Sequence, residues 1–157
     1  MLHYFRRGEP AYAMARIALV ALDAASLART ALDRGRHRAF AASAAIEALW
    51  GGGLRLLEDT ARDFLPPGTA ARGGHSAPEA DERRWRLRHE AAARRMAAAG
   101  IGVAADPDAY VALRRRWDAL VHAFAADMAY RWSDIAPHEG GSAAPPARRR
   151  PAGAGPP

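Results

Sequence analysis

The sequence lacks cysteine, lysine, asparagine and glutamine, and the missing cysteine narrows what the protein can do. Without cysteine there is no disulfide framework, no thiolate zinc site and no cysteine nucleophile. All 23 basic residues are arginine, and alanine fills 41 of the 157 positions. We attribute this skew to a GC-rich codon bias rather than to function. The length of 157 residues predicts one domain with one modest hydrophobic core.

Long hydrophobic runs are also missing. The longest apolar stretch, residues 11–22, contains Arg16 and ends before Asp23, so it falls short of the ~20 apolar residues that a membrane-spanning helix needs. Arg6-Arg7 is similar to the basic start of a signal peptide, but Glu9-Pro10 follows it. We therefore expect a protein of the cytoplasm or of the inner face of the cell membrane, without a span or a cleaved leader.

The formal net charge of +6 is divided between two parts of the chain. Residues 140–157 (GGSAAPPARRRPAGAGPP) hold three arginines and no acid, which leaves 20 arginines and 17 acids in residues 1–139. Because those arginines are interleaved with acids, we expect a solvated surface and no specific nucleic-acid binding. The tail has too few apolar groups to fold and is predicted to be disordered. Its Arg148–Arg150 cluster is expected to solvate the chain or to contact an acidic partner or a lipid surface.

Apolar residues recur at helical spacing along residues 1–139, and no strand pattern or repeat appears. We predict an all-α bundle domain of four to five helices over residues 1–139. The first three helices are expected at about residues 10–33, 36–50 and 54–65. A linker at about 66–78 follows them. The fourth helix then extends to about residue 99, and the fifth begins at Pro107. Two apolar faces on the first helix indicate that it is packed between neighbours.

Several residues mark the ends of the predicted helices. Ser76 and Glu79 fit a capping box at the start of the fourth helix, and Gly100 is placed to end it in a left-handed conformation. Asp106-Pro107 begins the fifth helix, which has the clearest amphipathic pattern, with Tyr110, Leu113, Trp117, Leu120, Val121, Phe124 and Met128 on one stripe. Gly51–Gly53 separates the second and third helices. Since a glycine inside a helix costs roughly 1 kcal/mol relative to alanine, either the helix breaks there or another backbone approaches closely.

The histidines and acids offer few arrangements for catalysis or metal binding. His89-Glu90 begins an H-E-x-x-H zinc motif, but Ala93 stands where the second histidine belongs. We expect His89 to be a partly buried, hydrogen-bonded core residue. The acids of residues 58–63 are offset by Arg55 and Arg62, so no metal site is predicted there. The sequence thus predicts no cofactor and no catalytic, cofactor-binding or metal-binding residue.

Asp118 and His122 are four residues apart on the fifth predicted helix, which is the spacing of an orienting pair for acid–base work. Such a pair is more often a helix-surface ion pair worth a few tenths of a kcal/mol. No nucleophile or third group accompanies it. A small helical enzyme using this pair is one alternative function, and a nucleic-acid-associated protein acting through its arginines is another. Self-association through exposed parts of the first helix is compatible with both of these alternatives and with a non-enzymatic interaction domain.

Two passages of the sequence resemble those of a known family in their order and spacing. The first comprises residues 3–7 (HYFRR) and 18–25 (ALVALDAA), and the second comprises residues 97–101 (AAAGI), Arg116-Trp117, Phe124-Ala125 and 130–133 (YRWS). Together they resemble the cytosolic C-terminal region of bacterial potassium-channel-like membrane proteins of the two-helix pore type. The similarity extends over most of residues 3–135.

This resemblance implies a helical domain that follows the inner pore helix of such a protein. The chain has no pore helices and no motif like the Thr-Val-Gly-Tyr-Gly filter, whose carbonyl groups replace the hydration shell of an ion. It is therefore not expected to conduct ions by itself, and no ion-binding residue is implied. Our leading prediction is a non-enzymatic helical interaction or regulatory domain, partnered by a channel-like membrane protein or by a second copy of itself.

Overall fold

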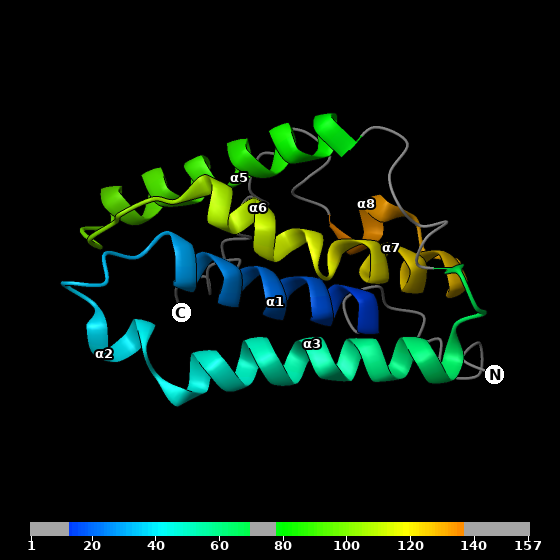
Figure 1. Ribbon diagram of the computed structural model, residues 1–157. Helices are drawn as coiled ribbons and strands as arrows, with labels where there is room; N and C mark the ends of the chain where they lie inside the picture. The colour runs from blue at the N-terminus through cyan, green and yellow to red at the C-terminus, as the bar shows by residue number, and fades with distance from the viewer. Residues whose placement is uncertain (1–12, 70–77, 137–157) are drawn as a thin grey trace, which may run out of the picture.

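The described part of the chain is built from helices arranged as a bundle (Figure 1). The computed structural model describes residues 13–69 and 78–136. Its helices are α1 (Met14–Thr30), α2 (Arg38–Ala41), α3 (Ala44–Phe64), α5 (Pro78–Ala98), α6 (Pro107–Arg115), α7 (Asp118–Asp127) and α8 (Trp132–Ile135). The predicted all-α class is confirmed: among the described residues there is an isolated bridge between Leu32 and Val103 but no strand. The predicted tail, with its three arginines, and Ser76 lie outside the described residues.

Helix α1 is the centre of the bundle and contacts α3, α6, α7 and α8. Its buried face carries Ala15, Leu19, Leu22 and Ala25. These side chains share one apolar cluster with residues of α3 and α7 and of the turn before α7, among them Trp50, Leu54, Leu57, Trp117, Val121 and Phe124. Because burying one large apolar side chain contributes about 1.5–3 kcal/mol, this cluster is the main force that holds α3 and α7 against α1.

Part of the opposite face of α1 is not covered by the described residues. Ile17 and Val20 are 56% and 60% exposed, and Ala24, one turn further on, is also exposed. The prediction that the first helix is covered on both apolar faces is therefore wrong at these positions. The physical reason is that the neighbouring helices of the described chain cover the face of Leu19 and Leu22 instead.

Helix α3 runs without a break through the three glycines, so the predicted pair of helices at 36–50 and 54–65 is wrong. The chain breaks earlier, between α2 and α3, where the Ser43 side chain caps α3 by accepting a hydrogen bond from the Ile46 N–H at 3.3 Å. Packing against α1 outweighs the low helix propensity of glycine, since most helical stability in proteins comes from tertiary contacts. At Gly53 the close approach is made by a side chain, because an added Cβ would lie 3.2 Å from a Leu22 methyl group.

The fifth predicted helix is divided into α6, α7 and α8. Its start is confirmed, since the Asp106 side chain accepts a hydrogen bond from the Ala109 N–H at 2.9 Å and Pro107 occupies the first turn. At the first interruption the N–H groups of Arg116 and Trp117 bond three residues back instead of four, which tightens the turn. At the second, Ala129 has a φ of 56°, a left-handed conformation that ends the helix.

Helix α5 and helix α6 form a smaller second cluster in which Trp85, Tyr110 and Val111 are buried, with Leu27 of α1 packed against them. Ion pairs join α5 to its neighbours at the surface, including Arg86 to Asp108 at 2.9 Å. Gly100 ends the turn after α5 with a φ of 78°, which confirms its predicted left-handed conformation.

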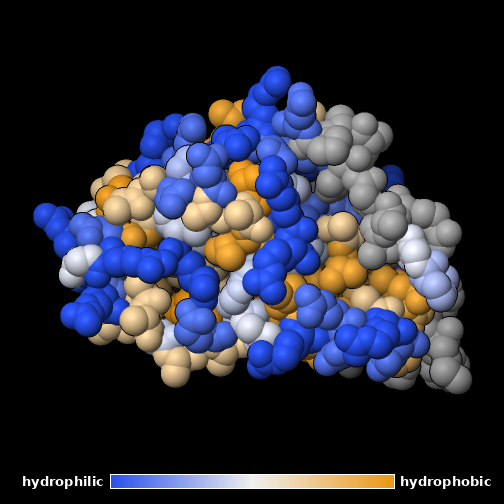
Figure 2. Space-filling model, viewed as in Figure 1, coloured by the Kyte–Doolittle hydropathy of each residue, from blue (hydrophilic) through white to orange (hydrophobic). Residues whose placement is uncertain are grey.

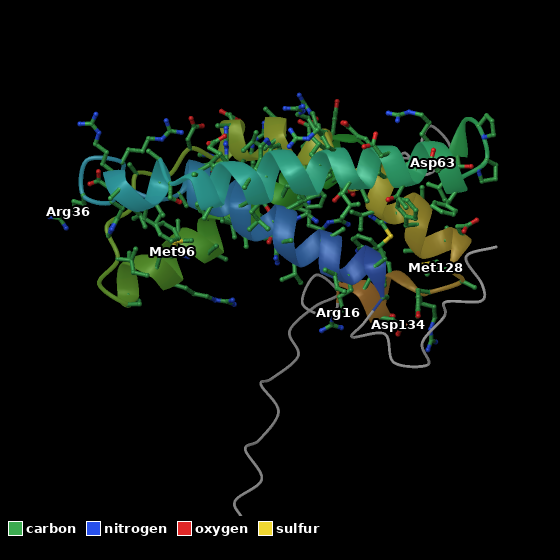
Figure 3. The ribbon with its side chains drawn as sticks, turned by 90° about the horizontal axis from the view of Figure 1, so that it is seen from below. Arg16, Arg36, Asp63, Met96, Met128 and Asp134 are labelled. Atoms are coloured by element: carbon green, nitrogen blue, oxygen red, sulfur yellow. The ribbon has the colours of Figure 1, made fainter. Side chains whose placement is uncertain are left out.

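At the other end of the bundle α8 is tied to α1. The Arg16 side chain donates a hydrogen bond of 3.0 Å to the backbone carbonyl of Asp134, and Figure 3 shows these two residues side by side. In the part of the chain that the structure describes, no helix combines the length and the apolar character needed to cross a membrane.

Candidate functional site

Polar side chains interrupt the buried face of α1 in its second half. Asp23, Ser26 and Thr30 are all buried there. The two hydroxyl groups donate hydrogen bonds to the carbonyl groups four residues earlier, Ser26 to Leu22 at 2.6 Å and Thr30 to Ser26 at 2.8 Å. Asp23 has no such local partner within α1 and instead reaches across the bundle.

The Asp23 carboxylate accepts hydrogen bonds from two other helices. Arg88 of α5 donates to Oδ2 through Nη2 at 2.5 Å and through Nε at 3.1 Å. On α6, the Tyr110 hydroxyl donates to Oδ1, and Arg114 donates to the same oxygen at 3.3 Å. A buried carboxyl group is costly unless it is paired and hydrogen-bonded, and these donors supply both conditions for Asp23 at the centre of the bundle.

Arg114 links Asp23 to a second buried carboxylate. Its side chain is fully buried, and its Nε donates to Oδ1 of Asp118 at 2.9 Å while its Nη1 donates to the Tyr110 hydroxyl at 3.0 Å. The guanidinium carbon also lies 5.5 Å from the ring centroid of Trp85 and 5.0 Å from that of Trp117. Both contacts are within the range of cation–π attraction.

We call these five side chains the polar core: Asp23, Arg88, Tyr110, Arg114 and Asp118. Two arginines balance two aspartates, so the set has no net charge when the tyrosine is neutral. Burial raises the pKa of the Tyr110 phenol above its usual range; nearby Arg114 opposes this shift and Asp23 adds to it. The phenol therefore stays protonated at neutral pH and acts as a hydrogen-bond donor to Asp23.

The predicted Asp118–His122 pair exists, but it is not a surface ion pair. Asp118 is buried and His122 Nε2 lies 3.5 Å from its Oδ2, a longer contact than that with Arg114. The imidazole is 21% exposed and stacks on the Trp132 ring, with centroids 3.5 Å apart and planes at 16°. Asp118 thus connects the polar core to a partly exposed histidine of α7 that stacks on Trp132, the first residue of α8.

His89 is more deeply buried than predicted. It is fully buried on α5, and its ring centroid lies 5.1 Å from that of Tyr110. The prediction that His89 is only partly buried is therefore wrong. Burial lowers the pKa of His89, and the Thr30 backbone and nearby carboxylates such as Asp106 only partly oppose this shift.

Two neighbouring clefts lie at the end of α1 away from α8. The larger cleft has a volume of about 700 Å³ and is lined by residues from the segments 29–35 and 104–113. The smaller cleft has a volume of about 390 Å³, and Arg29, Arg38 and Glu47 are among the residues that line it. Neither Asp118 nor His122 lines them.

The acids in these clefts are engaged locally. Arg29 donates to Glu47 and lowers the pKa of that carboxyl group. Asp33 accepts the backbone N–H groups of Gly35 and Arg36, and these hydrogen bonds, that of Arg36 first, lower its pKa. Asp106, which also lines the larger cleft, accepts the Ala109 N–H at 2.9 Å, so each described acid of the clefts already accepts a hydrogen bond.

The acids of residues 58–63 do not converge on a site. Arg62 pairs with Asp59 at 2.8 Å on the surface of α3. Within the described residues, no group of three or more histidine, aspartate or glutamate side chains is arranged to hold a metal ion.

Sequence reasoning missed most of the polar core. A signal for part of it was present, because Tyr110, Arg114 and Asp118 recur every four residues on one helical face. Asp23 also interrupts an otherwise apolar face of α1. Comparisons with protein-family models, curated proteins and solved structures found no match for this chain.

Proposed function

We propose that this chain is a non-enzymatic helical interaction domain associated with a bacterial channel-like membrane protein of the two-helix pore type, at the inner face of the membrane. The observation that carries the proposal is the exposure of large apolar side chains, seven of them on helices and one, Ile101, in the segment between α5 and α6. They are Ile17, Val20, Phe40, Leu49, Leu56, Phe64, Leu87 and Ile101.

Two pairs of these exposed side chains lie close together. Ile17 and Val20 are one turn apart on α1, and Leu49 and Leu56 are two turns apart on α3. On the face that Figure 2 shows, hydrophobic side chains lie across the middle of the bundle between hydrophilic ones. Single exposed apolar residues are ordinary, but grouped ones are typical of surfaces that bind another protein.

The polar core supports a structural rather than a catalytic role for the buried charges. Arg114 lies 2.9 Å from the Asp118 carboxylate and His122 lies 3.5 Å from it, so Arg114 is the closer partner of its charge. A general base needs access to a substrate proton, and neither Asp118 nor His122 lines the two clefts. The resemblance of residues 3–135 to channel tails then favours an interaction domain over a small enzyme.

The channel relationship is tested first by reading the DNA upstream of the Met1 codon. An in-frame continuation that encodes two hydrophobic helices around a filter motif would support a channel tail. A stop codon directly upstream would leave only a free-standing accessory domain.

The accessory form is tested by mixing the purified chain with a two-helix-pore protein of the same genome in detergent. We expect the two proteins to elute together in size-exclusion chromatography, at a constant ratio across the peak. Separate elution, together with an upstream stop codon, would contradict the channel relationship.

A further inference from the structure

Helix α3 carries a second apolar line beside the one it buries. Ala45, Leu49, Gly52 and Leu56 follow one another at steps of four, three and four residues, the spacing of a helix–helix seam. We call these four residues the outer seam. Leu49 is 41% exposed and Leu56 is 64% exposed, and both belong to a helix that the apolar core already fixes through Trp50, Leu54 and Leu57.

Gly52 is the residue of the outer seam that the single chain does not explain. A Cβ added there would meet no atom within 4 Å, whereas at the adjacent Gly53 it would lie 3.2 Å from the Leu22 side chain. Glycine inside a helix is less stable than alanine, so Gly53 has a packing reason and Gly52 has none among the residues that the structure describes. A glycine in the middle of an exposed apolar seam is suited to the close approach of another backbone.

The charges near the two ends of α3 are of opposite sign. Arg34, Arg36 and Arg38 precede the helix, whose first turn also holds Glu47, already paired with Arg29. Glu58, Asp59 and Asp63 lie in its last two turns, where Arg62 is the one arginine. Figure 3 shows Arg36 and Asp63 at opposite ends of the molecule. An antiparallel arrangement of two such helices brings unlike charges together and aligns the helix dipoles favourably, whereas a parallel arrangement brings like charges together.

We propose that α3 pairs in an antiparallel manner with α3 of a second copy of this chain, about a two-fold axis near Gly52. This inference rests on the proposed function, because it names the partner of one surface of the interaction domain. Leu49 of each copy then lies opposite Leu56 of the other, and the basic end of each copy faces the acidic end of its partner. The same surface serves both copies, as a two-fold interface requires.

A second copy fits this surface better than an unrelated protein does. The outer seam is self-complementary in shape, with one leucine three residues before Gly52 and one four residues after it. It is also self-complementary in charge, since Arg36 and Asp63 lie at opposite ends of the molecule (Figure 3), so that a two-fold axis near Gly52 places each of them at the end that holds the other residue in the second copy.

The experiment is light scattering coupled to size-exclusion chromatography of the purified full chain over a hundredfold range of concentration. We expect the wild-type mass to rise from 16.8 kDa to twice that value as the concentration increases. Leu49→Asp/Leu56→Asp should raise the dissociation constant of the dimer at least tenfold, with an unchanged circular dichroism spectrum. The matched control is Ile17→Asp/Val20→Asp on the exposed face of α1, which should leave the dissociation constant unchanged.

Two results would overturn the inference. One is a wild-type chain that keeps the monomer mass at every concentration. The other is a dimer that the α1 double substitution dissociates and the α3 double substitution does not, which would assign the contact to α1. Neither result bears on binding to a two-helix-pore protein. That binding is tested by co-elution in detergent, and its outcome does not depend on the mass of the free chain.

Discussion

Arg114 is the residue on which the polar core depends. It is fully buried and bonds to Asp23, Tyr110 and Asp118, so it neutralises two carboxylates that are otherwise far apart in the sequence. A buried arginine of this kind contributes to stability mainly because it prevents the buried carboxylates from being left without a counter-charge. Removing one partner of a buried ion pair is therefore far more destabilising than the pair is stabilising.

We predict that Arg114→Met lowers the free energy of unfolding by about 3–5 kcal/mol, because it leaves Asp118 buried without its cation. The measurement is urea denaturation followed by circular dichroism at neutral pH. Arg115→Met is the matched control: its side chain is 58% exposed and pairs with Glu82 at the surface, so its effect should stay within about 1 kcal/mol. Equal effects of the two substitutions would contradict a central role for Arg114.

His89 makes stability depend on pH. Its pKa is lowered in the folded protein by burial, so below about pH 6.5, the ordinary pKa of histidine, the unfolded chain binds more protons than the folded one. The contribution of neutral His89 to the free energy of unfolding is therefore fully present above about pH 7. It falls as the pH decreases towards the pKa of His89 in the folded protein, by at most about 1.4 kcal/mol per pH unit.

We predict that His89→Leu removes this loss of stability between about pH 7 and pH 5, since leucine fills the buried position without a titrating group. The measurement is the urea-unfolding free energy of both proteins at several pH values in that range. The two curves should separate as the pH falls, with the variant the more stable at the acidic end. Parallel curves would show that another group controls the acid sensitivity.

At this scale the sequence allows only part of the polar core to be predicted. The spacing of Tyr110, Arg114 and Asp118 places them on one face of a helix, which periodicity can show. Asp23 lies 87 residues before Tyr110, and a single sequence contains no signal that pairs them. The predicted surface position of Asp118 was wrong because its partner Arg114 is itself drawn inside by two tryptophan rings.

At the scale of the helices, α3 shows how tertiary packing overrides local propensity. The glycine run was compatible with a break, but Trp50 and Leu54 on either side of it both pack against α1 and keep the helix continuous. By contrast, the predicted starts and ends that depend on capping chemistry, such as Asp106 and Gly100, are confirmed. Caps are local and readable from sequence, whereas helix continuity depends on which neighbours cover each face.

The three glycines are therefore not equivalent. In the background of Leu49→Asp/Leu56→Asp, we predict that Gly52→Ala stabilises the monomer by up to about 1 kcal/mol because alanine favours the helix. Gly53→Ala should gain less or destabilise, since its methyl group would press on Leu22 at 3.2 Å. Thermal unfolding of both variants measures the difference, and a larger gain for Gly53→Ala would contradict the packing described here.

At the scale of the whole molecule, the bundle has a charge-balanced interior and apolar groups on its outside. The core of α1, α3 and α7 accounts for folding, and the polar core fixes α5 and α6 onto it. Neither needs the side chains of Leu49 and Leu56 to be apolar. The central claim is that these exposed leucines belong to an antiparallel contact between two copies of α3.

The absence of cysteine from the natural sequence makes this claim testable by disulfide cross-linking with single introduced cysteines. If Leu49 of one copy lies opposite Leu56 of the other, then Ala45 lies opposite Thr60. An oxidised mixture of Ala45→Cys and Thr60→Cys proteins, carrying tags of different length, should therefore give a mixed dimer on a denaturing gel, with little cross-linking of either protein alone. Cross-linking of Ala45→Cys to itself, or no mixed dimer at concentrations where the mass doubles, would contradict the antiparallel pairing of α3.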